Sequence, residues 1–558
     1  MKFFYLLLLI TIGYFIFLFF FKRRKNKKNE LLTLLKTEWG NPKKDYFHFD
    51  VISIYFDQVK EDCFQEVGNK MMLDLDLESV FQEIDHTKSR IGQQYLYNAF
   101  RRPKGSKVEL EKIDEAVEHF SKNPTQVFEL QQFLSSLDDF EDYYFPFLIF
   151  GELPKKISWL WVITFLQMLA FGSIILAFFK IDFLLVLIAI FPINVFLHYW
   201  NKKKVGRNTR VFNRLSKIHD SAEQIHQIID PKFVDVSLKK DLADVKNIVN
   251  KISWIKIDKT FQESEVLALA WMVIELIKII SLTEFSTFYK VIEEINTKKE
   301  SFHHLFKFIG KTDFILSIAS YRSSLTSFSK PIFTENKKEI QVEKIQHPLL
   351  EECVANDLHL ENKSLLLTGS NMSGKTTFIR SVGVNVLLAQ TIFTTLSEKY
   401  QAPFFKLATS IRISDDISEG KSYYLAEVDS INDLLKNAKT NEAPYLFIID
   451  EVFKGTNTIE RVGAARAILA FLNQKNHLVL VSTHDIELTD FLKDGFVLYH
   501  FQEQIQNDEL FFDYKLKKGI LQKRNAIRIL ELAEYPQEVI DHARATAYFL
   551  ENEKSKEL

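Results

Sequence analysis

The stretch LLLTGSNMSGKTTFIRS, Leu365 to Ser381, decides the fold expected for the C-terminal part of the chain. Three apolar residues, typical of a buried strand, lead into a turn of glycine and small polar residues, and a helical pattern follows. The turn fits the spacing G-x-x-x-x-G-K-[ST], in which glycines let successive backbone N–H groups face phosphate oxygens. The stretch therefore predicts a phosphate-binding loop between a strand and a helix.

This loop is expected to bind ATP. Lys375 would supply a positive charge to the β and γ phosphates, and Thr376 a hydroxyl to Mg²⁺. An ordinary glycine turn is the alternative, and the strand-like and helix-like flanks argue against it. The loop residues predicted to bind the nucleotide are Gly369, Ser370, Asn371, Met372, Ser373, Gly374, Lys375, Thr376 and Thr377.

Two further apolar runs end in polar residues. The run YLFIIDE predicts a buried strand that places Asp450 beside Mg²⁺, and Glu451 where it can orient or deprotonate the attacking water. The run HLVLVSTHD ends in His484, which would sense the γ phosphate. Because such short runs alternate with helical segments, residues 341–558 are expected to form a parallel α/β ATPase domain.

These motifs resemble those of the MutS family of mismatch-repair ATPases. TGSNMSGKTTFIRS is similar to the family's T-G-P-N-M-G-G-K-S-T, with Ser370 where the family usually has proline, and DEVFKGTNTIERVGAARAIL and STHDIELTDF are similar to two further family segments. SDDISEGKSYYLAEV is similar to the segment that completes the ATP site of the opposite subunit. The resemblance thus implies a homodimer in which Ser422 acts in trans, and it places Val354 and Tyr514 against the adenine.

The resemblance extends beyond the ATPase domain, over about Leu75 to Ala543. FQEIDHTKSRIGQQYLYNAFRRP is similar to the start of the family's helical core domain, which implies DNA as a partner. The mismatch-reading domain of the family, with its Phe-x-Glu wedge, is expected to be missing, because too few residues precede this core-like region. The triplet Phe64-Gln65-Glu66 fits the wedge, but a chain with 51 phenylalanines produces such triplets by chance.

Two long apolar segments predict membrane spans. Phe3 to Phe21 is followed by a basic cluster, and the run is long for a signal peptide and lacks a small-x-small cleavage site, so an uncleaved anchor is expected over residues 1–28. The block from Ile157 to Trp200, broken at Lys180-Ile181-Asp182, predicts a transmembrane helical hairpin; a buried helical pair in a soluble core is the alternative. The lysines that flank both segments place the ATPase domain in the cytoplasm.

A third apolar stretch, Val266 to Leu282, carries Glu275 and Lys278 in its middle. Ionised groups are costly in lipid, so this stretch is predicted to be a buried helix of a soluble region, with membrane contact as the alternative.

Composition adds little to these motifs. Lys and Arg total 71 against 73 Asp and Glu, so no overall basic charge indicates nucleic acid, although a local basic face remains compatible with it. The expected architecture is a multidomain chain with an N-terminal transmembrane helix, an all-α core and lever region interrupted by the hairpin, and a C-terminal α/β P-loop ATPase domain of the ABC type. The predicted ranges are 1–28, 29–156, 157–200, 201–340 and 341–558.

Together these observations favour a membrane-tethered MutS-like ATPase. It would use ATP and Mg²⁺, form a homodimer, clamp DNA and lie in the inner or plasma membrane as a multi-pass protein. The second hypothesis is an ATP-dependent membrane switch that acts on a protein or lipid partner without nucleic acid. An ABC transporter is the third, and three predicted spans are few for a transport pathway.

Overall fold

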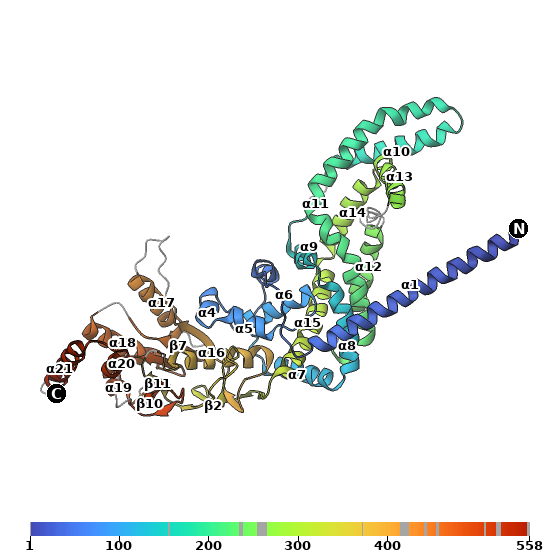
Figure 1. Ribbon diagram of the computed structural model, residues 1–558. Helices are drawn as coiled ribbons and strands as arrows, with labels where there is room; N and C mark the ends of the chain where they lie inside the picture. Colours follow the sequence, from blue (N-terminus) through green and yellow to red (C-terminus); the bar gives the residue numbers. More distant parts are fainter. Residues whose placement is uncertain are drawn as a thin grey trace. The chain divides into compact units, whose positions relative to one another are not determined.

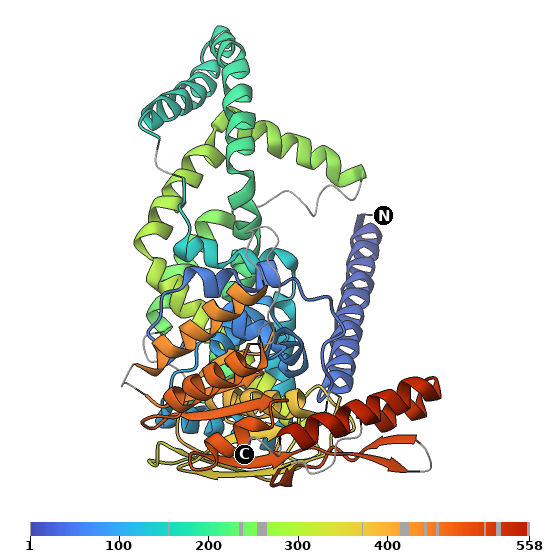
Figure 2. The same ribbon diagram turned by 90° about the vertical axis from the view of Figure 1, so that its left-hand side faces the viewer.

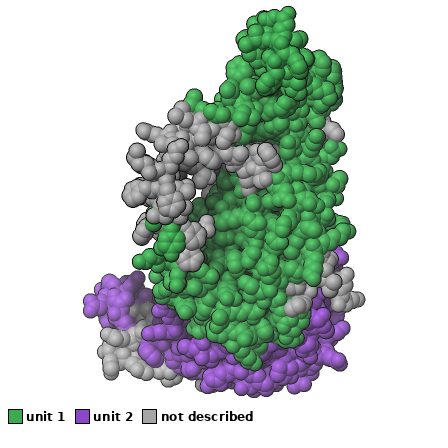
Figure 3. All heavy atoms as spheres, turned by 90° about the vertical axis from the view of Figure 1, so that its right-hand side faces the viewer, with its two compact units in different colours: residues 1–61, 84–99, 115–324 green, residues 62–83, 100–114, 325–558 purple. Residues whose placement is uncertain are grey.

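The computed structural model describes residues 2–154, 157–233, 238–253, 265–370, 372–412, 423–439, 443–453, 457–506, 509–520 and 526–554. The chain divides into two compact units, coloured separately in Figure 3. Unit 1 comprises Met1–Glu61, Ile84–Ala99 and Glu115–Ser324, and unit 2 comprises Asp62–Glu83, Phe100–Asp114 and Leu325–Leu558. Because the chain passes between the units several times, neither unit is one continuous stretch. The five predicted domain ranges remain a prediction.

The described residues of unit 1 form helices, 3-10 turns and connecting loops (Figure 1). The helices of which at least half lies in this unit are α1 (Lys2–Glu38), α2 (Phe49–Ile52), α3 (Ile54–Gln58), α6 (Arg90–Arg101), α7 (Lys107–Lys122), α8 (Pro124–Leu134), α9 (Pro146–Phe150), α10 (Leu160–Ala177), α11 (Leu184–Ile228), α12 (Leu238–Ser253), α13 (Glu265–Ser281), α14 (Thr283–Thr297) and α15 (Lys299–Ser324). The helical region expected after the hairpin is therefore present as α11 to α15.

Helices α10 and α11 pack side by side and are joined by the short turn η3 (Ile181–Phe183) (Figure 1). Two segments, Leu160–Ala177 and Ile181–Asn201, are long and apolar enough to cross a membrane by length and composition. Only 22% of each segment is buried within the protein. A helical pair in a soluble core would bury most of its apolar side chains, so this exposure does not fit that alternative.

The first predicted span lies in α1, a continuous helix that extends beyond residue 28. The side chains of most of its apolar first half lie outside the described residues. Its last turns pack against α8, where Leu35 is buried and the Trp39 and Phe128 rings meet edge to face.

The third apolar stretch forms most of α13, which is buried on one face and exposed on the other. In α13, Glu275 and Lys278 are buried, whereas four apolar side chains are exposed: Met272, Val273, Leu276 and Ile277. Composition alone could not show this, because it counts charged residues without regard to the face of the helix that carries them.

Unit 2 is built on a six-stranded sheet with the strand order β12-β9-β4-β8-β7-β6. Neighbouring strands from β9 to β6 are parallel, and β12 pairs antiparallel to β9 at the edge. Figure 2 shows the strands of this unit, yellow to red, grouped together. The strands are β4 (Ser364–Thr368), β6 (Lys406–Ser410), β7 (Tyr445–Asp450), β8 (Leu478–Thr483), β9 (Phe496–His500) and β12 (Lys517–Lys518).

Helices connect the parallel strands, as expected from the alternating pattern. α17 (Tyr423–Ala438), α18 (Thr458–Leu472) and α19 (Glu487–Leu492) follow β6, β7 and β8, and α16 (Lys375–Ile392) follows β4. Strands β4, β7 and β8 are almost completely buried and form the core of the unit with these helices. Since parallel strands end at one edge of a sheet, the residues after β4, β7 and β8 come together there.

A smaller sheet and a hairpin complete unit 2. The second sheet has the order β1-β5-β2-β3, and β10 pairs antiparallel with β11. Their bounds, with those of the remaining helices, are β1 (Ile332–Phe333), β2 (Glu339–Ile345), β3 (Asn356–Glu361), β5 (Lys399–Ala402), β10 (Glu503–Gln506), β11 (Glu509–Phe512), α4 (Asn69–Asp74), α5 (Leu77–Ile84), α20 (Ala526–Leu532) and α21 (Gln537–Lys554).

The triplet that matched the wedge pattern is used for packing within unit 2. Phe64 meets Phe404 edge to face, Gln65 exchanges hydrogen bonds with the backbone of Leu407, and Glu66 pairs with Arg102. These contacts account for all three side chains without a nucleic-acid role.

Candidate nucleotide-binding site

The turn between β4 and α16 adopts a backbone that requires glycine at both ends. Gly369 has a φ of 148°, and a Cβ there would lie 2.7 Å from the carbonyl oxygen of Phe501. Gly374, the residue before α16, has a φ of 103°. Both values disfavour a side chain. The turn therefore brings the backbone N–H groups at the start of α16 to the edge of the sheet, where the helix dipole favours an anion.

Lys375 lies inside this turn rather than in solvent. Its Nζ donates to the carbonyl oxygens of Gly369, at 2.9 Å, and Ser370, at 2.7 Å, and lies 3.4 Å from His484 Nε2. The side chain is buried. A buried ammonium group held at the mouth of the turn has the charge and the position that a polyphosphate needs.

Thr376 and Asp450 form an oxygen-rich corner beside the turn. The hydroxyl of Thr376 donates to Asp450 Oδ2 at 2.9 Å, and the hydroxyl of Ser482 donates to Asp450 Oδ1. Hydroxyl and carboxylate oxygens are hard ligands of the kind that Mg²⁺ prefers. The donor set fits Mg²⁺, which Thr376 and Asp450 would hold.

Glu451 follows Asp450 in a left-handed backbone conformation, with a φ of 64°. Its N–H donates to the carbonyl of Ser482 at 2.9 Å, which fixes the chain where β7 ends. Its carboxylate lies 3.0 Å from His484 Nε2, and both side chains are partly exposed. The structure thus brings a carboxylate and an imidazole together next to Lys375, in the arrangement expected of a base and the group that orients it.

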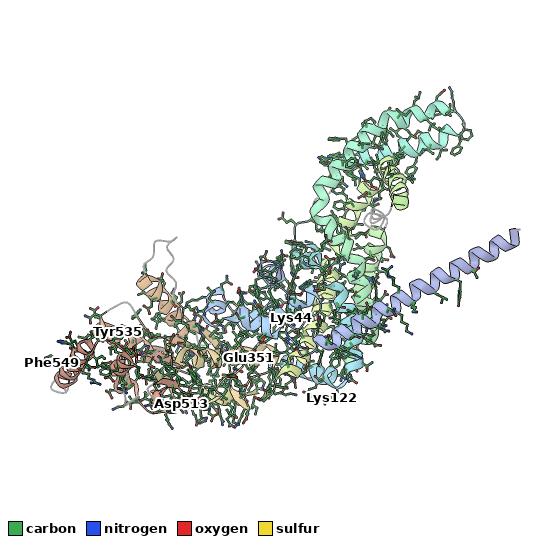
Figure 4. The ribbon with its side chains drawn as sticks, viewed as in Figure 1. Lys44, Lys122, Glu351, Asp513, Tyr535 and Phe549 are labelled. Carbon is green, nitrogen blue, oxygen red and sulfur yellow. The ribbon has the colours of Figure 1, made fainter. Side chains whose placement is uncertain are left out.

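A pocket of about 490 Å³ opens beside the turn. Its walls come from the turn, from the start of α16, and from two separate segments around Val354 and Tyr514. Figure 4 labels Glu351 and Asp513, which lie close to these two residues in the sequence. Other lining side chains are Ile345, Cys353, Asn356, Met372, Thr377, Phe378 and Phe501. The residues expected to contact the adenine and those expected to contact the phosphates therefore share one cavity.

Asn356 joins the two segments that border this pocket. Its side-chain amide donates to the carbonyls of Val354, at 3.0 Å, and Tyr514, at 2.9 Å, and its Oδ1 accepts from the N–H of Leu516 at 2.7 Å. The side chain of Asn356 thus sets the distance between the Val354 and Tyr514 segments, where the adenine is expected to bind. No sequence motif indicates this role, because Tyr514 and Leu516 are about 160 residues away from Asn356 along the chain.

His347 stabilises the loop before Val354. Burial, assisted by the positive charge of Arg380, lowers the pKa of His347 to about 4. The neutral ring accepts a hydrogen bond at Nδ1 from the N–H of Leu349, at 3.3 Å, and the N–H of His347 itself contacts Cys353 Sγ at 3.4 Å. The loop is therefore held by a histidine that stays uncharged at neutral pH.

Three other contacts were missed by sequence reasoning. Ser370, at the position usual for proline, donates to Glu503 Oε2 at 2.7 Å, and Glu503 is buried. Arg461 holds Asp485 through two hydrogen bonds of 2.9 and 2.6 Å, next to His484. Ser482 fixes Asp450. Each pairs residues from different elements, and although most of these residues lie in recognised motifs, the motifs do not show which of them are partners.

Two predicted site residues, Asn371 and Ser422, lie outside the described residues. So do Gly455 and Thr456 of the segment DEVFKGTNTIERVGAARAIL. Asn457 of the same segment caps α18 by accepting from the N–H of Ile459 at 3.1 Å.

Known proteins with similar sequences are consistent with a nucleotide-binding site of this kind. Residues 365–551 match the sequence model of the protein family described as MutS domain V. The DNA mismatch repair protein MutS of Staphylococcus epidermidis is 31% identical over 287 residues, and that of Listeria welshimeri is 32% identical over 285 residues. These matches support membership of the MutS family for this part of the chain. The MutS protein of Thermotoga petrophila is 33% identical over 276 residues.

The match is partial on both sides. It covers 49%, 49% and 47% of this chain, and the chain spans only 32%, 33% and 33% of these MutS relatives. The MutS likeness therefore characterises the domain V part and does not by itself describe the whole protein.

Proposed function

We propose that the chain is a membrane-tethered MutS-like ATPase that works as a dimeric, ATP-driven clamp on DNA. The observation that carries the ATPase part is the meeting of Lys375, Asp450 and Glu451 at one edge of the sheet. Phosphoryl transfer to water requires a positive charge for the phosphates, oxygen ligands for Mg²⁺ and a base for the water. Lys375, Asp450 and Glu451 are suited to these three roles.

In the proposed reaction, Lys375 exchanges its contacts with the loop carbonyls for the β and γ phosphates of ATP. Val354 and Tyr514 border the adenine. Mg²⁺ at Thr376 and Asp450 would supply neutralising charge to the phosphate oxygens. Glu451 takes a proton from the attacking water, and His484 holds the carboxylate at 3.0 Å in the orientation this needs.

The proposed dimer rests on the family resemblance of the segment that contains Ser422. In that arrangement each subunit binds ATP on its own phosphate-binding loop. The segment around Ser422 of the other subunit completes the set of groups that surround the phosphates. Closure of the dimer on ATP would then move the helices of unit 1. This movement would couple ATP binding to the action of the protein on its partner.

Membrane attachment is proposed to come from the α10–α11 hairpin together with the first half of α1. The exposed apolar side chains of the hairpin and the lysines on both of its flanks support this, and the lysines put the ATPase domain in the cytoplasm.

Deleting residues 1–21 is expected to leave the protein in the membrane fraction after an alkaline wash, because the hairpin alone suffices as an anchor. In the same shortened chain, Phe171→Lys with Ile188→Lys places two charges on exposed apolar positions of the hairpin and should release it. Release of the shortened chain without these two lysines would contradict the proposed hairpin anchor.

DNA as the partner is supported by the printed names of the relatives, which are DNA mismatch repair proteins. Protein in lipid nanodiscs is expected to bind duplex DNA with an affinity that falls steeply between roughly 50 and 200 mM salt, because each phosphate contact releases a counterion. Empty nanodiscs serve as the control. If DNA is not bound at the lower salt concentration, the alternative of a membrane switch that acts on a protein or lipid partner takes its place.

A further inference from the structure

Helix α13 has its polar and apolar faces reversed relative to a helix in a soluble protein. Met272, Val273, Leu276 and Ile277, at positions i, i+1, i+4 and i+5, share one face and are 45–61% exposed. Glu275 and Lys278 lie on the opposite face and are 6% and 5% exposed. In water this arrangement carries two costs, since apolar area is hydrated and charged groups are buried.

The polar face of α13 is bound to the α10–α11 hairpin. His198 Nε2 lies 2.9 Å from Glu275 Oε1, with both side chains buried. Further along α13, Asn194 donates to the carbonyl of Ile280 at 3.0 Å, and Gln167 donates to the carbonyl of Ser281 at 2.9 Å. Hydrogen-bonding side chains at a helix interface with an apolar exterior are the typical packing of helices in lipid.

These contacts also fix the direction of α13. As α11 runs from Asn194 to His198 toward the end of the hairpin segment, α13 runs the opposite way, from Glu275 to Ile280. Gln167, which meets the last residue of α13, lies near the middle of α10. The C-terminal half of α13 therefore lies beside the half of the hairpin that is nearer its two ends.

A turn at Leu282, between α13 and α14, reverses the chain near the middle of α10. Leu282 has a φ of 47° and begins α14, and Lys278 and Glu284, on either side of the turn, pair at 3.7 Å. Phe285 of α14 then packs against Trp159 and Trp200, which lie at the two ends of the hairpin. Tryptophan is enriched at the boundary between lipid and water, so this aromatic group is suited to mark that boundary.

We propose that residues 272–281 of α13 enter the lipid bilayer beside the hairpin, and that the chain turns back at Leu282 without crossing the bilayer. The occupant of the exposed apolar face is the hydrocarbon of the bilayer. In that environment the apolar side chains contact lipid, and the charged groups lie between helices, where Glu275 meets His198 and Lys278 pairs with Glu284. The inference rests on the proposed membrane position of the hairpin and adds a third helix to it.

Single cysteines test this proposal in the full chain reconstituted into liposomes, with Cys63 and Cys353 replaced by alanine. Val273→Cys probes α13, and Ile188→Cys probes the hairpin. Val108→Cys in α7 is the matched control in water, since Val108 is 61% exposed and Val273 57%. A water-soluble maleimide is expected to react at positions 273 and 188 about tenfold or more slowly than at 108, because hydrocarbon disfavours the reactive thiolate. After denaturation in SDS all three should react equally.

A fluorophore attached at each cysteine before reconstitution distinguishes lipid from protein as the cover. Nitroxide-labelled lipids are expected to quench it at positions 273 and 188 but not at 108. Fast labelling at 273 with slow labelling at 188 would overturn the inference and leave the hairpin anchor intact. Fast labelling at both would reject the membrane hairpin itself. Slow labelling at 273 without quenching by lipid would mean that a protein surface covers α13, which also overturns the inference.

Discussion

Lys375→Ala is expected to weaken ATP binding by about two orders of magnitude, or ~3 kcal/mol, because it removes the charge that faces the phosphates. The same change removes the hydrogen bonds to the carbonyls of Gly369 and Ser370, so the turn itself loses a support. Equilibrium binding of a fluorescent ATP analogue measures the effect. Lys399→Ala is the control, since Lys399 is partly exposed and forms only a surface ion pair with Glu343 at 3.6 Å, and its loss should leave binding unchanged.

Glu451→Gln separates the two roles within the site. Binding should stay within a few-fold of the original chain, because Thr376, Asp450 and Lys375 are untouched, whereas hydrolysis should fall by about 10²–10⁴-fold once the base is lost. The ATP-bound variant is then expected to have the molar mass of a dimer by light scattering. Equal loss of binding in the lysine and glutamate variants would refute the separate roles given to them.

The parts of the site that were predictable are those in which a short segment carries both the strand and the functional residue. β4, β7 and β8 each end in such residues, and parallel strands bring their ends together regardless of what lies between. The sequence therefore predicted that Lys375, Asp450, Glu451 and His484 lie at one edge of a parallel sheet, and the structure has them there; their roles stay a prediction.

The missed contacts depend on distances that no single segment encodes. Asn356 acts by joining Val354 to Tyr514, and Glu503 acts by reaching Ser370, each across more than a hundred residues. For α13 the composition shows Glu275 and Lys278 but not the face that carries them or their partners. Those partners, on the hairpin and on α14, are visible only in three dimensions.

The segment IDHTKSR, which resembles the start of the family core, is explained in this chain by its packing against α15. Asp313 of α15 accepts from the N–H of Lys88 at 2.9 Å and from the N–H and hydroxyl of Ser89 at 2.7 and 2.6 Å. The carboxyl is completely buried, and a Cβ on Gly92 would lie 2.1 Å from its Oδ2. His86 adds a hydrogen bond to Ser320 at 2.8 Å.

Asp313→Ala is expected to destabilise unit 1 by about 3 kcal/mol or more, because three buried donors lose their acceptor. The melting temperature in detergent should fall by roughly 5–10 °C, and hydrogen exchange in α15 should accelerate. Asp220→Ala, which removes an exposed carboxylate of the same unit, should change neither measurement appreciably. An unchanged melting temperature in the Asp313 variant would mean that this polar contact does not hold the helices together.

The same carboxyl predicts a dependence on pH. Burial raises the pKa of Asp313 to about 6, against the opposing effect of its donors. An unfolded aspartate titrates near 4, so between about pH 4 and 6 the folded state binds more protons than the unfolded state, and stability falls as the pH rises through that window, by about 3 kcal/mol for this group. Asp313→Asn keeps a carbonyl acceptor but cannot titrate, so the difference in melting temperature between it and the original chain should grow less unfavourable from pH 5 to pH 8. A constant difference in melting temperature would show that the pKa of Asp313 is ordinary. The hydrogen-bond donors would then offset the effect of burial on that pKa.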